Sequence, residues 1–208
     1  MRAPANRTVT ELLEQLAARI PAPGGGVTAA IHGGQAAALL AMVARYTTGE
    51  RYSEHAGVVD RCITEADTWR TRFLELAADD ESAFTAVGVA YTLPRSTDGE
   101  KQDRSAAIAD ALIGAATPPA EVIAGAAELA TIAETLLPIG NKNVITDVAA
   151  AADAIRAAAT TGRVNVEINL GGIVDAGERL RLTGVIATVD DIVRRADAVS
   201  STVRATFY

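Results

Sequence analysis

The chain has 208 residues, enough for one large domain or two small ones, and its formal net charge of −7 argues against non-specific binding to nucleic acid or to anionic membranes. Hydrophobic residues make up 49% of the chain but aromatic residues only 4%, so alanine supplies much of the apolar surface and helices are favoured over a sheet. Cys62 is the only cysteine, which excludes an intrachain disulfide, and two histidines far apart in sequence do not indicate a metal site.

Neither a signal peptide nor a membrane span is predicted. Residues 1–7 carry two arginines and no apolar core. No apolar run of membrane-spanning length is free of charges and glycines. We therefore expect a cytoplasmic protein that binds neither nucleic acid nor membranes.

Two helices open the predicted fold. The first begins with a capping-box pattern, Thr8-x-x-Glu11, and ends near Arg19. The second runs from about Val27 to Tyr46 and is apolar nearly all round, which is typical of the interior of a helical bundle. We therefore expect His32, within the second helix, to be buried or to face a pocket.

A glycine-rich turn, Pro21-Ala22-Pro23-Gly24-Gly25-Gly26, joins these two helices. The prolines favour an extended approach, and the glycines leave the first amide groups of the helix uncovered. Such a helix start favours an anionic ligand, which makes Gly24, Gly25 and Gly26 candidate binding residues. A plain helix-entry turn, or glycines that let two helices touch, would explain the motif equally well.

The rest of the chain is also predicted to be helical. From Ser53 to Tyr91 the apolar spacing indicates one very long helix, or two that meet near Asp79. Asn165–Asp175 alternates like a strand, but a lone strand among helices is rare, so we expect it to be helical. Further helices are predicted over about Asp98–Ala116, from Pro119 to about Leu137, from Asn143 or Thr146 to about Thr160, and over Val185–Thr206. The predicted fold class is all-α, one domain over residues 1–208 built as a bundle of long alanine-rich helices.

Polar residues lie at several places where a helix should be apolar. Asp80 lies on the face of its helix that should be buried, whereas its neighbours Asp79 and Glu81 fit a solvated acidic face. Arg104 lies near a core stripe, where an arginine pairs with a carboxylate or binds an anion, although an ordinary surface position is as good an explanation.

The richest polar cluster surrounds a turn. Asn141 and Asn143 flank a lysine just before a helix, and Asp147 follows one turn into that helix beside alanines. Asparagine amides both donate to and accept from a heterocycle, while turn and cap roles would account for one of the two. Capping explains Asp147 poorly. In a further cluster, Asn165-Val166-Glu167-Ile168-Asn169, we expect the amides to pair with backbone groups.

In their order along the chain, these clusters resemble the cyclodeaminase/cyclohydrolase family of folate enzymes. The resemblance extends from about Leu12 to Asp175. The matching stretches are PAPGGGVTAA (21–30), AMVARYTTG (41–49), DDESAFTAVGVAY (79–91), LPRSTDGEKQDR (93–104), GNKNVITDVAAA (140–151) and NVEINLGGIVD (165–175). The resemblance implies an all-helical homodimer with a folate site in a groove between helices, near the subunit interface.

The resemblance implies one of two reactions on a tetrahydrofolate derivative, with no metal. One hydrolyses 5,10-methenyltetrahydrofolate to 10-formyltetrahydrofolate, and the other closes 5-formiminotetrahydrofolate to the methenyl form with loss of ammonia. The methenyl bridge is a cation, so Asp147 or Asp80 would stabilise its charge or activate water. The binding residues would be Asn141 and Asn143 at the pterin edge, and Gly24–Gly26 and Arg104 at the anionic parts of folate.

The sequence departs from the family pattern mildly at Thr146, at His32 and Gln35, and most clearly in one further region. Gly49-Glu50-Arg51-Tyr52 stands where the family has a lysine-rich G-K-K-K-Y, and Arg45 and Tyr46 stand where asparagine and leucine are usual. These changes suggest an alternative function, in which a divergent member transfers a folate-borne one-carbon unit to a second substrate such as an amine, by a Mannich-type reaction or a biosynthetic ring closure.

A third hypothesis is a non-enzymatic helical binding module. It predicts that Asp80, Arg104 and Asp147 lie apart on the surface, whereas both enzyme hypotheses predict that they line one cavity. With no formiminotransferase domain in these 208 residues to supply a formimino substrate, hydrolysis is the favoured reaction.

Overall fold

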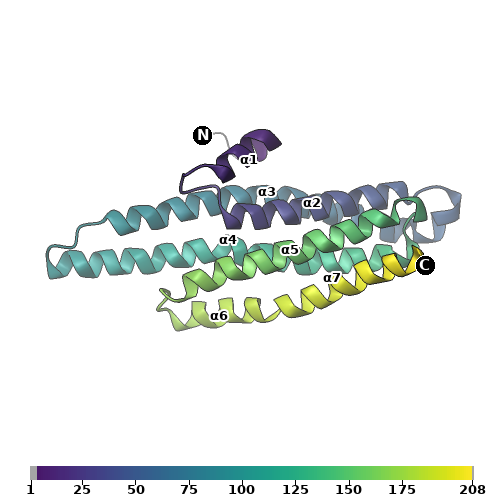
Figure 1. Ribbon diagram of the computed structural model, residues 1–208. Helices are drawn as coiled ribbons and strands as arrows, with labels where there is room; N and C mark the ends of the chain where they lie inside the picture. Colours follow the sequence, from purple (N-terminus) through teal and green to yellow (C-terminus); the bar gives the residue numbers. More distant parts are fainter. Residues whose placement is uncertain (1–3, 208) are drawn as a thin grey trace.

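The computed structural model describes residues 4–207, and every regular element among them is a helix, as the sequence predicts (Figure 1). The chain forms a bundle of long helices joined by short turns. Its elements are η1 (Pro4–Asn6), α1 (Val9–Ala17), α2 (Gly25–Tyr46), η2 (Glu50–His55), α3 (Ala56–Thr92), α4 (Asp98–Ile139), η3 (Lys142–Val144), α5 (Ile145–Leu170), α6 (Ala176–Ala187), α7 (Val189–Arg204) and η4 (Ala205–Phe207), where η denotes a short 3₁₀-helix.

The core of the bundle combines many alanines with buried leucine, isoleucine and valine side chains, and its largest fully buried side chain is an aromatic ring. Phe73 of α3 is fully buried, and its ring lies 5.6 Å from that of Trp69. A Cβ atom added at Gly33 of α2 would lie 2.4 Å from the Phe73 ring, and one at Gly125 of α4 would lie 2.7 Å from both rings. These two glycines therefore leave the space that the aromatic pair fills between α2, α3 and α4.

Capping boxes begin two of the helices, and the sequence predicts the first of them. The Thr8 side chain accepts from the backbone N–H of Glu11, and the Glu11 carboxylate accepts from that of Thr8. The same box between Thr97 and Glu100 begins α4, so the cap residue is Thr97 and not Asp98, which is the first residue of the helix.

The predicted helix breaks are wrong in three places. Helix α4 continues through Pro118 and Pro119, and α5 continues through Gly162 to Leu170. Both prolines are buried, as are Ala115, Ala116 and Ala120 around them, and the packing of α4 against α3, α5 and α2 offsets the cost of the two missing N–H groups. The helix predicted over Val185–Thr206 is instead divided at Thr188 into α6 and α7. Of the two alternatives for α3, the structure has the single long helix, without a break at Asp79.

Two of the helices, α2 and α4, are long and apolar enough to cross a membrane when judged by length and composition alone. Only 56% and 50%, respectively, of their most apolar 18-residue windows are buried within the bundle, and core helices of globular proteins pass the same test. The prediction of no membrane span, which rested on charges and glycines in every long apolar run, is therefore not confirmed for these two helices.

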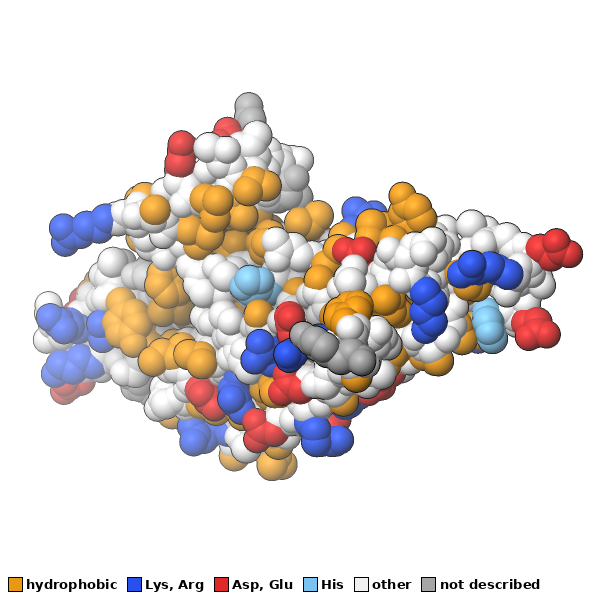
Figure 2. Space-filling view, turned by 45° about the vertical axis from the view of Figure 1, so that its right-hand side comes forward, with side chains coloured by type: hydrophobic (Ala, Val, Ile, Leu, Met, Phe, Trp, Pro, Cys, Tyr) orange, Lys and Arg blue, Asp and Glu red, His pale blue; other side chains and the backbone are white. Residues whose placement is uncertain are grey.

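Helix α1 lies outside the bundle, over α2 and α3 in Figure 1, and none of its side chains is buried. Its apolar residues Val9 and Leu13 are exposed. Figure 2 shows a group of hydrophobic side chains around this helix, at the top of that view. Leu12 of α1 packs, half-buried, against the core, and the N-terminal segment is also held through η1, which packs on α3.

The connections give the bundle two distinct ends. Because α2 and α5 are antiparallel neighbours, the start of α2 lies beside the end of α5, and the end of α2 lies beside the start of α5 (Figure 1). Beyond the first of these ends, the paired tips of α3 and α4 project as an arm, which we define as residues 86–106.

Candidate functional site

A cavity of about 300 Å³ opens where α2 begins. The turn between α1 and α2 forms one wall, and α3, α4 and α5 form the others. The lining residues are Pro21, Ala22, Gly24, Gly25, Gly26, Asp80, Phe84, Ala115, Asn165, Ile168 and Asn169. Three sequence clusters, the glycine turn, Asp80 and the Asn165–Asn169 segment, therefore meet in one place.

Asp80 is the charged group of this cavity. Its side chain is half-buried and, within residues 4–207, forms no ion pair. Burial raises the pKa of the Asp80 carboxyl to about 6, the neighbouring Glu81 contributes to the rise, and the backbone N–H of Val27 opposes it by donating to the carboxylate. The group is thus mostly ionised at neutral pH but far more basic than an exposed aspartate.

The glycine turn leaves space for the Asp80 carboxylate at the start of α2. A Cβ atom at Gly26 would lie 1.9 Å from Oδ1 of Asp80, and one at Gly25 would lie 3.0 Å from Nδ2 of Asn165. No side chain caps the helix at Gly24. The sequence predicts that an anion binds at this helix start. In the structure, the Asp80 carboxylate of the same chain lies there.

Two amides on successive turns of α5 line the opposite wall. Asn165 donates through Nδ2 to the carbonyl of Thr161, and Asn169 donates to that of Asn165, both at 2.8 Å. The predicted pairing with backbone groups is therefore present. Because it uses one N–H of each amide, each side chain keeps an N–H and a carbonyl oxygen for other partners. No binding role was predicted for these residues, although their spacing by one helical turn on the same face was a usable signal.

The proline pair in α4 adds a backbone acceptor. Ala115 lines the cavity, and in a regular helix its carbonyl would accept from the N–H of residue 119. That residue is Pro119, which has no N–H to donate. The carbonyl of Ala115 is therefore without its regular helical donor beside the cavity.

The rim of the cavity is apolar and open. The side chains of Phe84 on α3 and Ile168 on α5 line the cavity and are nevertheless 49% and 77% exposed. Large hydrophobic groups so exposed beside a polar cavity are typical of a surface that a ligand or another protein covers.

The second polar cluster lies at the other end of the bundle. Asn141 donates from its side chain to the carbonyl of Tyr46 and from its backbone to Thr47, and it accepts from the backbone of Asn143. These bonds are the turn role that sequence analysis considered. Asp147, half-buried in the first turn of α5, is 18 residues before Asn165 on the same helix, about 27 Å away.

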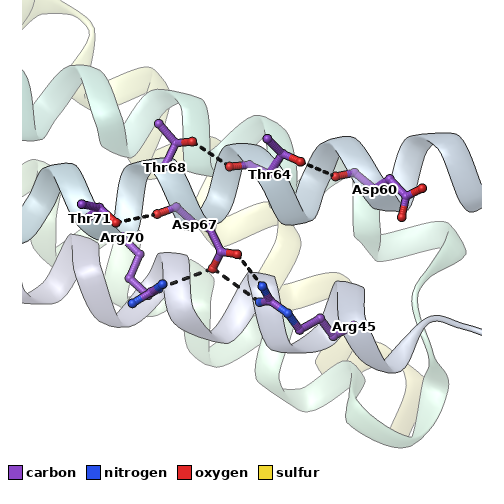
Figure 3. A network of polar contacts seen from close by, with 7 residues as sticks. All are labelled: Arg45, Asp60, Thr64, Asp67, Thr68, Arg70 and Thr71. Carbon is purple, nitrogen blue, oxygen red and sulfur yellow. Dashed lines mark hydrogen bonds and ion pairs between the residues drawn. The ribbon is translucent and has the colours of Figure 1, made fainter.

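The departures from the family pattern over residues 45–52 also lie at that other end. Arg45 forms an ion pair with Asp67 of α3, which Arg70 contacts as well (Figure 3). The pKa of Asp67 is lowered chiefly by its hydrogen bond with Arg45. A smaller cavity of about 220 Å³ beside them includes Arg45 and Gly49. Within one chain, these altered residues do not line the Asp80 cavity.

Two further candidates lie outside the cavity. Arg104 lies in the arm, where its guanidinium donates to the carbonyl of Tyr91 and faces the Tyr91 ring. It is 11 residues before Ala115 on α4, about 16 Å further out. His32 is half-buried on α2 and is not among the lining residues. A single chain therefore unites Gly24–Gly26 with Asp80 but not with Arg104, His32, Asn141, Asn143 or Asp147.

No group of three or more metal-ligating side chains occurs in the part of the chain that the structure describes. The chemical groups of the cavity are a carboxylate, two carboxamides and backbone polar groups. Such a set can bind and protonate or deprotonate a polar, cationic heterocycle.

Known proteins resemble this chain over most of its length. The family described as Formiminotransferase-cyclodeaminase matches residues 8–186. The methenyltetrahydrofolate cyclohydrolase of Methylorubrum extorquens is 37% identical over 187 residues, which are 88% of this chain and 90% of that protein. The formimidoyltransferase-cyclodeaminase of Rattus norvegicus is 30% identical over 78% of this chain but only 30% of its own length.

A solved structure agrees with these matches. The crystal structure of formiminotetrahydrofolate cyclodeaminase from Thermotoga maritima superposes with a TM-score of 0.87 at 29% identity. The superposition covers 98% of this chain and 99% of that chain. The similarity therefore includes the whole bundle and the helices that form the cavity.

Proposed function

Because the chain belongs to the formiminotransferase-cyclodeaminase family, we propose that it is a folate-dependent one-carbon enzyme whose reaction takes place in the Asp80 cavity. The favoured reaction is hydrolysis of 5,10-methenyltetrahydrofolate to 10-formyltetrahydrofolate. Cyclisation of 5-formiminotetrahydrofolate with loss of ammonia is the other reaction of the family. The name of the Methylorubrum relative, which is matched over nine-tenths of its length, supports hydrolysis.

The observation that carries this proposal is an unpaired carboxylate with a pKa of about 6 in a cavity lined by amides. At neutral pH the charge of Asp80 stabilises the cationic methenyl bridge, and its raised basicity suits it to accept a proton from water. Water adds to the bridge carbon, the bond from that carbon to N5 breaks, and the formyl group stays on N10. One water proton ends on N5, carried there by Asp80, and the other is released to solvent.

The pterin edge offers donors and acceptors that Asn165, Asn169 and the carbonyl of Ala115 complement. We therefore assign pterin binding to this wall, in addition to the residues expected from the sequence. No step requires a metal or an organic cofactor. Transfer of the one-carbon unit to an amine is less well supported, because the altered residues that suggested it lie at the other end of the bundle.

We expect the enzyme to be a homodimer, because the apolar rim formed by Phe84 and Ile168 is uncovered in one chain. Asp147, Asn141 and Asn143 would then act in catalysis only if a second subunit carries them to the rim. Light scattering on the purified protein would measure the assembly. A cytoplasmic location without membrane attachment also stays a prediction.

The direct test measures the loss of methenyltetrahydrofolate absorbance on addition of the purified protein, with no second substrate. We expect hydrolysis by the wild-type chain and its near-complete loss in Asp80→Asn. Calorimetry with tetrahydrofolate derivatives separates binding from catalysis. An active Asp80→Asn variant would contradict the role of the carboxylate, and a wild-type protein that binds no tetrahydrofolate derivative would contradict the proposal as a whole.

A further inference from the structure

Two neighbouring acids on α3 face different surroundings. Asp80 lines the cavity described above, whereas Glu81 lines an adjacent one of about 630 Å³ under the α1–α2 turn. The two cavities share Pro21 and Ala22. Of these two acids, only Glu81 has a cationic partner among the described residues.

That partner is Arg7, from the N-terminal segment. Its guanidinium donates to both carboxylate oxygens of Glu81, at 2.5 and 2.8 Å, across 74 residues of sequence. The Arg7 side chain is only 2% exposed and that of Glu81 is 16% exposed. A partly buried bidentate pair of this kind fixes the direction of the carboxylate as well as its charge.

The ion pair also anchors the segment that precedes α1. Helix α1 has no buried side chain, while η1, directly before Arg7, packs on α3. The pair therefore holds the N-terminal segment against the helix that carries Asp80. Arg7 precedes residues 8–186, the part of the chain that matches the family, so this contact is not part of the matched pattern.

We propose that Arg7 is a positioning residue for the Asp80 site, which holds Glu81 away from the cavity and neutralises it so that Asp80 remains the one free carboxylate there. The proposal rests on the function assigned to Asp80 above.

The groups around Asp80 make this inference specific. The described residues that face it from α2 and α5 are uncharged, namely the N–H of Val27 and the amides of Asn165 and Asn169, and α4 contributes Ala115. Glu81 is therefore the neighbouring charge, and it acts to raise the pKa of Asp80. Without Arg7, an unpaired Glu81 would strengthen that effect, and Asp80 would be protonated over a wider pH range.

The test is an NMR titration of the Asp80 carboxyl carbon in the full-length protein without ligand. In Arg7→Gln we expect the pKa of Asp80 to rise by about one unit, which would reduce its ionised fraction at pH 6 about fivefold. Arg7→Lys, which keeps the charge, should stay near the wild-type value. Arg7→Gln combined with Glu81→Gln should return to that value or below it, because both charges are then absent.

Enzyme assays give a second readout. The acidic limb of the pH profile for methenyltetrahydrofolate hydrolysis should move upward in Arg7→Gln and return in the double variant. If no variant and no wild-type protein hydrolyses this substrate, the proposed reaction is wrong, yet the NMR titration still decides the role of Arg7. An unchanged Asp80 pKa in a folded Arg7→Gln protein would overturn the proposal, since a purely structural anchor would lower stability without moving the titration.

Discussion

Replacing Gly26 by alanine should separate the geometry of the Asp80 site from the stability of the bundle. The added Cβ would lie 1.9, 2.3 and 2.5 Å from the carboxylate atoms of Asp80, where ordinary contact begins near 3.4 Å. The Asp80 carboxylate must therefore move by at least about 1 Å. Displacement of a reacting group by that amount costs on the order of 100-fold in rate, or about 2.7 kcal/mol of transition-state stabilisation.

The stability of Gly26→Ala should change much less than its activity. Alanine in place of glycine in a helix favours folding by up to about 1 kcal/mol. The lost hydrogen bond between Val27 and Asp80 costs about 1.5–3 kcal/mol, which the rehydration of the displaced carboxylate partly offsets. We expect a net change in the free energy of unfolding within about 1 kcal/mol, measured by urea denaturation.

Gly34→Ala is the matched control in the same helix. A Cβ at Gly34 would lie 3.8 Å from the Cβ of Phe73, which is an ordinary contact. This variant should keep wild-type kcat/KM and gain up to about 1 kcal/mol of stability. If Gly26→Ala instead kept more than about half of the wild-type kcat/KM, a fixed position of Asp80 would not matter for the reaction.

Three other predictions concern carboxylates. Burial raises the pKa of Asp80 from 3.8 to about 6, so the contribution of this carboxyl to the free energy of unfolding falls as the pH rises between those values. Denaturant titrations should therefore find Asp80→Asn more stable than wild type by about 2 kcal/mol at pH 7 and equal to it below about pH 4. If Asp147 acts across a dimer interface, inactive Asp80→Asn and Asp147→Asn proteins should recover activity when they are unfolded and refolded together, because one site of each mixed dimer then has both aspartates. No recovery would mean that Asp80 and Asp147 do not form a site shared between subunits. Asp67→Asn should lower the free energy of unfolding by less than about 1 kcal/mol at pH 7, because the ion pair of Asp67 with Arg45 is exposed. This loss should vanish as the pH falls through the lowered pKa of Asp67. A larger loss of stability in thermal denaturation would contradict this prediction.

Local features of the Asp80 cavity could be predicted from the sequence. The glycine turn and the uncovered helix start depend on the residues themselves, and so does the argument that Asp80 lies on an apolar face. The breaks predicted at Pro118 and Gly162 were wrong because local propensity is overridden where neighbouring helices bury both flanks.

Contacts between distant segments could not be predicted in the same way. From the sequence, Asp80 and Asp147 are both carboxylates in apolar surroundings. Only the antiparallel packing of α2 and α5 shows that they lie at opposite ends of the bundle within one chain. The ion pair between Arg7 and Glu81 joins residues 74 positions apart and leaves no periodic signal in the sequence. Sequence order alone does not state which helix ends meet.

The length of the helices has a consequence for how substitutions combine. Substitutions at sites more than about 10 Å apart that share no partners act almost independently on stability. Arg45 pairs with Asp67, and Arg51 lies over the ring of Tyr52, both at the end of the bundle away from the turn at Gly26 (Figure 1). We therefore expect substitutions near Arg45 and substitutions near Gly26 to change the free energy of unfolding additively.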